Sequence, residues 1–201
     1  IFYSMHMNWS ARIAQEHRDI LGAIEATNAE NVIVLPNNGN IRMASEAAAS
    51  ACEDANVAVV ATKTVLQAFS AMFVVDPDGS LEDNAEAMRE AIAEVRGGEV
   101  TRAVRDSQAA DGSPIHDGDV MGIQDGSIDV VGDDVKKVTL DLIAKMQDEE
   151  EGDSLTILAG SDMDDDAFED LVDAIEEAQP DLEVDAHRGE QPLYPIVFSV
   201  E

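Results

Sequence analysis

Two short polar segments, each directly following an apolar run, carry the side chains best suited to bind a small anionic or keto ligand. They are Asn37, Asn38, Asn40, Thr62, Lys63 and Thr64. Amides, hydroxyls and one ammonium group can together hold a phosphate or a carboxylate, although the strict glycine-rich phosphate-loop pattern is absent. The alternative is that these residues only build turns and cap the helices that follow. The sequence leaves both interpretations open.

The apolar runs before these segments predict two parallel strands that bring the polar residues together. Residues 32–35 and 57–61 are unbroken apolar stretches, typical of strands that are covered on both faces. Pro36 ends the first run, and small or apolar residues then recur at helical spacing from Ile41 to Cys52. A strand, a helix and a second strand form a βαβ unit, whose strands end at the same edge of a sheet. We therefore expect a parallel-sheet, Rossmann-like lobe with the candidate side chains at that edge.

Two helices follow the second polar segment. Residues 65–75 are apolar nearly throughout and predict a buried helix, while 81–95 carry one apolar face. Ser80 and Asp83 have the spacing of a capping box at the start of the second helix. We expect Gly97-Gly98 to end it.

An antiparallel segment is predicted next. Apolar and polar residues alternate over 99–107, and the stretches 120–124 and 127–131 flank Asp125-Gly126. The Asp-Gly pair favours the tight turn whose twist matches paired strands. We therefore expect a three-stranded antiparallel insertion over 99–131.

The second half reads as a smaller α/β lobe. Helices are expected at 135–146 and 168–175, and strands at 155–159, 182–186 and 196–200. The expected division is a poorly matched or added start at 1–15, a first α/β lobe at 16–98, the antiparallel insertion at 99–131, and a second α/β lobe at 132–201. Before that last lobe, Arg105 and Asp106 are either part of a site or an ion pair that links a strand to a helix.

The charge of the chain excludes several classes of partner. The 201 residues include 12 Lys and Arg against 43 Asp and Glu, a formal net charge of −31. Such a chain repels nucleic acid and anionic membranes. No apolar run is long enough to span a bilayer, and the single cysteine, Cys52, fits a reducing compartment, so we expect a cytoplasmic protein.

The residue types that a self-sufficient enzyme needs are dispersed. The four histidines, His6, His17, His116 and His187, form no pair at metal-ligand spacing. The acidic stretch 147–185 lacks the calcium-loop pattern, so a solvated surface or a surface for a basic partner accounts for it better than a metal site. A binding module is therefore expected, with no metal and no cofactor in this chain.

Five segments in register resemble a known family. They are ENVIVLPNNGNI at 30–41, ATKT at 61–64, GGEVTRAVRDS at 97–107, the Asp-Gly hairpin, and GEQPLYPIVFSVE at 189–201. In this order they are similar to the carboxyl-terminal domain of the fatty acid kinase A-subunit family, related to dihydroxyacetone kinases and labelled Dak phosphatase-like or Dak1-type. The resemblance spans roughly 20–201 and implies the α/β fold of DegV proteins and of dihydroxyacetone-binding kinase components. It also adds Gln191 to the candidate partner-binding residues.

This sequence departs from the family pattern at three of those positions. The family usually has Pro where Ala61 stands, Thr where Ser107 stands, and Gly where Glu190 stands. These differences are mild for the fold. They bear more on the partner and on any small ligand.

The resemblance implies a role in lipid metabolism without catalysis by this chain. In that family a separate amino-terminal domain binds ATP and magnesium, and a middle domain carries a Cys/His metal site. The part that resembles this chain is expected to dock a DegV-type fatty-acid-binding partner whose acyl carboxylate is phosphorylated. The parent protein is then a kinase, a phosphotransferase, and a homodimer is left open.

Two further hypotheses remain beside this one. The first is a small-molecule binding or phosphotransfer domain that holds a phosphorylated or keto ligand at the two polar segments. No histidine matches the one to which dihydroxyacetone-type kinases attach their substrate. The second treats the acidity as an adaptation to high salt, which is independent of mechanism.

Overall fold

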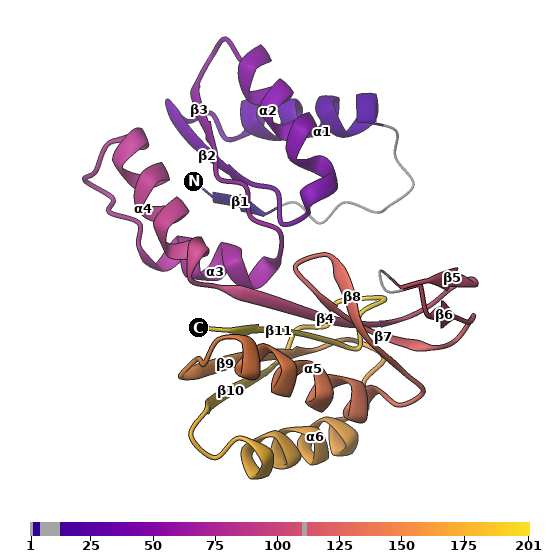
Figure 1. The fold of residues 1–201 in the computed structure, drawn as a ribbon. Coiled ribbons are helices and arrows are strands. Elements are labelled where there is room, and N and C mark those ends of the chain that lie inside the picture. Colours follow the sequence, from indigo (N-terminus) through magenta and orange to yellow (C-terminus); the bar gives the residue numbers. More distant parts are fainter. Residues whose placement is uncertain (1, 5–12, 110–111) are drawn as a thin grey trace. The chain divides into compact units, whose positions relative to one another are not determined.

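The computed structural model describes residues 2–4, 13–109 and 112–201. The chain divides into two compact units, Ile1–Val95 and Arg96–Glu201. Each has its own sheet and helices (Figure 1). Each also has its own buried apolar residues.

The first unit is built on a parallel sheet of three strands in the order β1-β2-β3. The strands are β1 (Phe2–Ser4), β2 (Asn31–Leu35) and β3 (Asn56–Val59), and both pairings are parallel. Four α-helices surround them: α1 (Ile13–Ala26), α2 (Arg42–Ala51), α3 (Val65–Phe73) and α4 (Leu81–Ala93). The parallel pairing of β2 and β3 agrees with the βαβ unit expected from the sequence.

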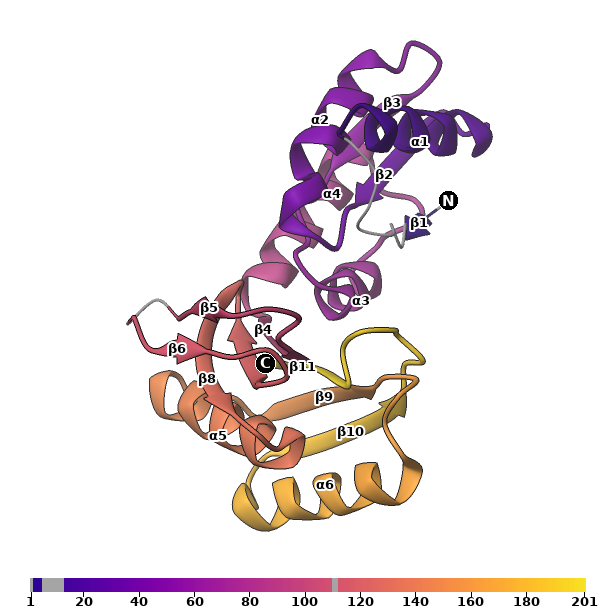
Figure 2. The ribbon, with the colours of Figure 1, turned by 90° about the vertical axis from the view of Figure 1, so that its right-hand side faces the viewer.

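The central strand β2 shows why its sequence is apolar throughout. Val32 and Val34 pack with α1 and α2 on one face, while Ile33 and Leu35 pack with α3 and α4 on the other. Figure 2 shows these helices around the strands. Successive side chains of a strand point to opposite faces, so both faces need apolar residues when helices cover both. The helix α4 begins as predicted, because the Ser80 hydroxyl accepts from the Asp83 N–H at 3.1 Å.

The second unit contains a mixed sheet of six strands in the order β10-β9-β11-β4-β7-β8. The bounds are β4 (Arg96–Arg102), β7 (Val120–Gln124), β8 (Ser127–Gly132), β9 (Ser154–Ala159), β10 (Glu183–Arg188) and β11 (Ile196–Val200). Only β9 and β10 pair in parallel. Helices α5 (Val135–Glu149) and α6 (Asp165–Ala178) pack on one face of this sheet, and β5 (Ser107–Gln108) and β6 (Pro114–Ile115) form a separate ribbon (Figure 1).

The expected antiparallel insertion is wrong as a separate element. Strands β4, β7 and β8 do form an antiparallel set, but β11 joins β4 to β9 in the same sheet. The 99–131 segment and the 132–201 segment therefore share one core, and the second unit is not a smaller lobe. The Asp125-Gly126 hairpin turn is confirmed, with φ of 48° and 92°.

The glycine pair at 97–98 was also misinterpreted. It lies inside β4 and does not end α4, which stops at Ala93, so the boundary falls between Val95 and Arg96. A Cβ on Gly98 would lie 2.2 Å from Cζ of Phe198, which is fully buried in β11. Glycine is therefore needed here for packing.

The start of the chain contributes to the fold. Phe2, Tyr3 and Ser4 pair with Ile33, Val34 and Leu35 of β2, although the first fifteen residues were expected to lie outside the matched fold. Residues 1 and 5–12 of that segment lie outside the described residues.

Candidate functional site

The two polar segments meet at the carboxyl ends of β2 and β3, as their order in a parallel sheet predicts. The Thr62 hydroxyl donates to Oδ1 of Asn37 at 2.8 Å and accepts from the Asn37 N–H at 3.0 Å. Thr62 is buried, and Asn37 has a φ of 57°, in the left-handed region that Asn tolerates. The two loops are thus joined by a reciprocal pair of hydrogen bonds.

Other polar groups at this edge hold turns and helix ends. Oδ1 of Asn38 accepts from the Asn40 N–H at 2.9 Å and caps the short helix η1 (Gly39–Ile41). The Thr64 hydroxyl accepts from the Gln67 N–H at 3.2 Å and caps α3. These are the bonds that the turn-and-cap alternative predicts, whereas ligand binding at this edge stays a prediction.

The same edge exposes one ammonium group. The Lys63 side chain is exposed. The backbone N–H of Lys63 donates to Oε1 of the buried Gln67 at 2.7 Å. The Gln67 amide in turn donates to the Val95 carbonyl at 3.2 Å. The backbone that carries Lys63 is therefore fixed to α3, and Asn40 is the other exposed candidate of this edge.

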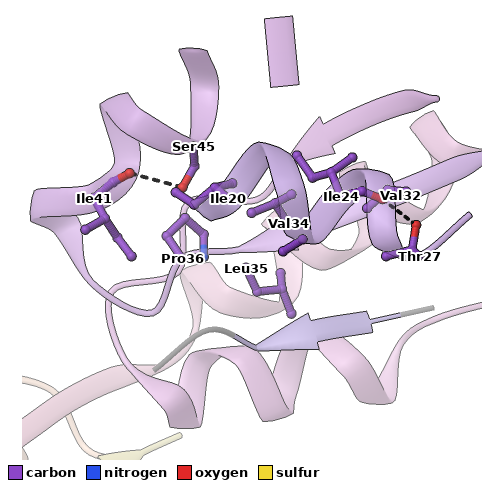
Figure 3. Close-up of a pocket in the computed structure, with 10 residues that line it drawn as sticks. Ile20, Ile24, Thr27, Val32, Val34, Leu35, Pro36, Ile41 and Ser45 are labelled. Atoms are coloured by element: carbon purple, nitrogen blue, oxygen red, sulfur yellow. Dashed lines mark hydrogen bonds between the residues drawn. The ribbon is translucent and has the colours of Figure 1, made fainter. Parts of the chain in front are cut away.

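A small apolar cavity lies between α1, α2 and β2, and Pro36 is among the residues that line it (Figure 3). Its volume is about 20 Å³. Its two hydroxyls bond to their own helices, Thr27 to the Ile24 carbonyl at 2.7 Å and Ser45 to the Ile41 carbonyl at 3.0 Å. A space of this size holds about one water molecule, so the cavity has no room for an acyl chain. Sequence reasoning missed it because a cavity depends on how helices pack.

The candidates Arg105 and Asp106 lie in the loop after β4, not in a strand as expected. Oδ1 of Asp106 accepts from the Asp117 N–H at 2.9 Å and lies 3.8 Å from Nδ1 of His116. Among the described residues, Arg105 has no hydrogen-bond or ion-pair partner, so the alternative of an ion pair between strand and helix is not found there.

The Gln191 side chain links its own loop to β9. Its Nε2 donates to the carbonyls of Leu158 at 3.0 Å and Tyr194 at 3.2 Å. Its Oε1 is buried without a partner among the described residues, and a Cβ on Gly189 would lie 2.1 Å from this oxygen. The side chain thus fixes the loop between β10 and β11, which also explains the glycine.

One acidic group on the second sheet was not predicted. Glu99 and Thr101 lie on the face of β4 opposite Val100, which belongs to the helix-covered core. Burial raises the pKa of the Glu99 carboxyl, and the Asp125 carboxylate raises it further. Burial and the charge of Glu99 likewise raise the pKa of the Tyr194 phenol. No signal in the sequence distinguishes Glu99 from the other carboxylates of the chain.

Within 2–4, 13–109 and 112–201, no group of three or more His, Cys, Asp or Glu side chains is arranged to hold a metal ion. None of the helices in these ranges has both the length and the apolar character that crossing a bilayer requires.

The chain matches one known protein family over nearly its whole length. The family of carboxyl-terminal domains like that of the fatty acid kinase A-subunit matches residues 5–201. The chain belongs to this family. Its relatives include uncharacterized proteins of Staphylococcus haemolyticus, 42% identical over 183 residues, and of Staphylococcus aureus, 40% identical over 184 residues. In both cases the match covers 91% of the chain but 33% of the relative, so this fatty acid kinase A-like domain spans about a third of their length.

Solved structures with the same fold include DegV proteins. The domain is similar to a DegV family protein from Eubacterium eligens loaded with heptadecanoic acid, with a TM-score of 0.61 and 15% identity over 96% of this chain and 86% of that one. It is also similar to the Streptococcus pneumoniae Fatty Acid Kinase B3 protein loaded with linoleic acid, with a TM-score of 0.60 and 11% identity over 96% and 85%. At such low identity the likeness establishes the fold alone.

Proposed function

We propose that this domain is the non-catalytic docking part of a fatty-acid-kinase-like protein. It binds a DegV-type fatty-acid-binding partner so that the acyl carboxylate reaches ATP on a separate domain. The observation that carries the proposal is the family match over residues 5–201 of a chain that spans about a third of its relatives.

The geometry of the first unit supports a docking role over an acyl-carrying one. At the strand ends, Asn37 and Thr62 bond to each other, and the cavity beside β2 measures about 20 Å³. In this proposal, the partner carries the acyl chain, because the cavity beside β2 is too small for it. In this proposal, magnesium and ATP are bound by the separate domain.

The reaction needs accurate positioning more than it needs acid or base groups from this domain. A carboxylate oxygen of the fatty acid attacks the γ-phosphorus of ATP, the bond from that phosphorus to the bridging oxygen breaks, and the products are acyl phosphate and ADP. Such transfers depend mainly on alignment and on neutralising charge at the phosphates. A docking domain contributes the first of these by holding the carboxylate in line.

Calorimetry with a fatty-acid-loaded DegV-type protein from the same organism tests the proposal. The partner is titrated separately into this chain and into the full-length parent, and we expect saturable binding in both, with a Kd in the micromolar range or tighter (about −8 kcal/mol). Binding to neither would refute docking altogether. Binding to the parent alone would place docking on another domain and would equally refute the role proposed here.

A further inference from the structure

The second unit exposes the side chains of Val104, Arg105 and Leu193 at one end of its sheet. In the register of the antiparallel pair β4 and β11, Val100 lies opposite Ile196, so the segment after β4 and the segment before β11 lie at the same end. The Thr101 hydroxyl connects them by donating to the Leu193 carbonyl at 2.7 Å. Val104 and Leu193 are 86% and 69% exposed at this end.

Leu193 adopts a backbone conformation that its side chain does not favour. Its φ is 72°, in the left-handed region where Gly is unstrained and Asn is tolerated. A strained residue is normally retained because its side chain packs in a core or contributes to function. The exposed Leu193 side chain gains little from packing within the unit, so core packing does not explain it.

The loop that carries Leu193 is held at several points. The Gln191 amide donates to the carbonyls of Leu158 and Tyr194, and the Ser161 N–H donates to the Gln191 carbonyl at 3.0 Å. The Gly160 N–H donates to the Pro195 carbonyl at 2.8 Å. A side chain fixed in advance loses little conformational entropy on binding, so this loop is suited to present an anchor residue.

Arg105 differs from the other Lys and Arg residues of the second unit in its bonding. Six of its seven Lys and Arg side chains bond to a carboxylate or a carbonyl of the described residues: Arg96, Arg102, Lys136, Lys137, Lys145 and Arg188. Arg105 has no such partner among the described residues, although the chain contains 43 acidic residues. An exposed guanidinium beside apolar side chains is a typical recognition group for a carboxylate on another protein.

We infer that Leu193, Val104 and Arg105 form the surface that docks the fatty-acid-binding protein of the proposed function, on which this inference rests. Leu193 enters an apolar pocket of that protein, and Arg105 pairs with a carboxylate at the rim of the pocket. The charge of −31 supports this arrangement, because most of the charged side chains elsewhere on so acidic a chain are carboxylates, which cannot pair with a carboxylate of the partner.

The rival surface is the apolar face of α3 in the first unit. Phe69 and Phe73 are exposed there, and no charged residue occurs between Thr64 and Val75. Nothing in the structure indicates what covers that face. It therefore supplies the matched control for an exposed apolar side chain.

The test uses the full-length parent protein and a fatty-acid-loaded DegV-type protein in calorimetry at low and high salt. We expect Leu193→Gly to weaken binding by at least about tenfold, as for an interface anchor. The same variant should keep or raise the urea midpoint, because glycine relieves the strained φ. Arg105→Glu should weaken binding to a similar extent and reduce its salt dependence, while Phe73→Ser should leave the Kd unchanged.

The outcomes separate this inference from the proposal beneath it. Unchanged binding by Leu193→Gly and Arg105→Glu, with a wild type that binds, overturns the docking surface and leaves the proposed function intact. Loss of binding in Phe73→Ser alone moves docking to α3. A wild type that does not bind overturns both. A lowered urea midpoint in Leu193→Gly would show that the side chain serves the fold of the unit.

Discussion

Thr62 and Asn37, 25 residues apart in sequence, satisfy each other's hydrogen-bonding groups at the ends of two neighbouring parallel strands. One threonine hydroxyl both donates to the asparagine carbonyl oxygen and accepts from its backbone N–H. This edge is the place where α/β sheets commonly bind ligands, and here two of the polar groups are used by the fold itself.

Thr62→Val should destabilise the first unit by about 1–3 kcal/mol, because the part-buried Asn37 N–H and amide oxygen lose the hydroxyl to which they bond. Thr62→Ser keeps the hydroxyl and loses only a methyl group, so its cost should be about 1 kcal/mol. Urea unfolding of both variants measures the difference. Equal midpoints for Val and Ser would show that the hydrogen bonds contribute nothing.

Inorganic phosphate should show no saturable binding at the strand-end edge. Lys63 and Asn40 are its exposed polar side chains, whereas Asn38 and Thr64 cap helices. We expect phosphate and dihydroxyacetone to cause no saturable chemical-shift change at these residues in the wild type. A saturable change that disappears in Lys63→Ala would instead support the small-molecule or phosphotransfer hypothesis.

Gly98→Ala should be among the costlier single substitutions in the second unit. The new Cβ would lie 2.2 Å from Cζ of Phe198, whose ring is fully buried and cannot move aside. Overpacking of this kind costs about 1–3 kcal/mol. Gly39→Ala is the control, since no atom lies within 4 Å of its added Cβ. A double variant with Phe198→Leu should recover part of the loss if the clash is the cause.

Glu99 should make a contribution to folding stability that depends on pH in the direction that its raised pKa predicts. Because burial and Asp125 raise its pKa in the folded state above the ordinary value of 4.5, folding favours the protonated form. This contribution is fully present below pH 4.5 and is lost as pH rises through the raised pKa. Glu99→Gln should therefore stabilise the protein at about pH 7 relative to wild type, and the gain should vanish near pH 4.

The measurement for Glu99 is a pair of urea midpoints at each pH, for the variant and the wild type. Glu94→Gln removes the same charge from an exposed position and corrects for general charge relief. A gain in Glu99→Gln that does not exceed the control, or that persists unchanged at about pH 4, would contradict the prediction.

Salt should stabilise the whole chain. With 43 acidic against 12 basic residues, repulsion outweighs the ion pairs, and both are screened as the Debye length falls from about 10 Å at 0.1 M to about 3 Å at 1 M. We expect urea midpoints to rise between these concentrations. A flat or falling midpoint would exclude the high-salt explanation of the acidity.

Local pattern was sufficient to predict much of the fold. The apolar run of β2, the capping pair Ser80 and Asp83, and the Asp125-Gly126 turn were all assigned correctly. Each is encoded within a few residues, by strand periodicity, by a helix cap or by positive φ. The parallel βαβ unit and the family resemblance followed from such segments in order.

The candidate site was predicted only in part. Proximity of Asn37 and Thr62 followed from the topology of parallel strands, but their bond to each other did not. Arg105 was expected in a strand and lies in a loop. Gln191 bonds to the carbonyls of Leu158 and Tyr194, and its expected contact with a partner stays a prediction. Residue type indicates which groups can bond, and the tertiary structure determines which partners they reach.

The sequence by itself determined the parallel βαβ core of the first unit, the hairpin and the family, because local periodicity and turn chemistry encode them. Only the tertiary structure decided the boundary at Val95, the six-stranded sheet and the purpose of Gly98. These depend on Phe198 and β11, about a hundred residues further along the chain. The sequence alone does not distinguish a glycine that ends a helix from a glycine that makes room for an aromatic ring. The residue that packs against the glycine decides between the two.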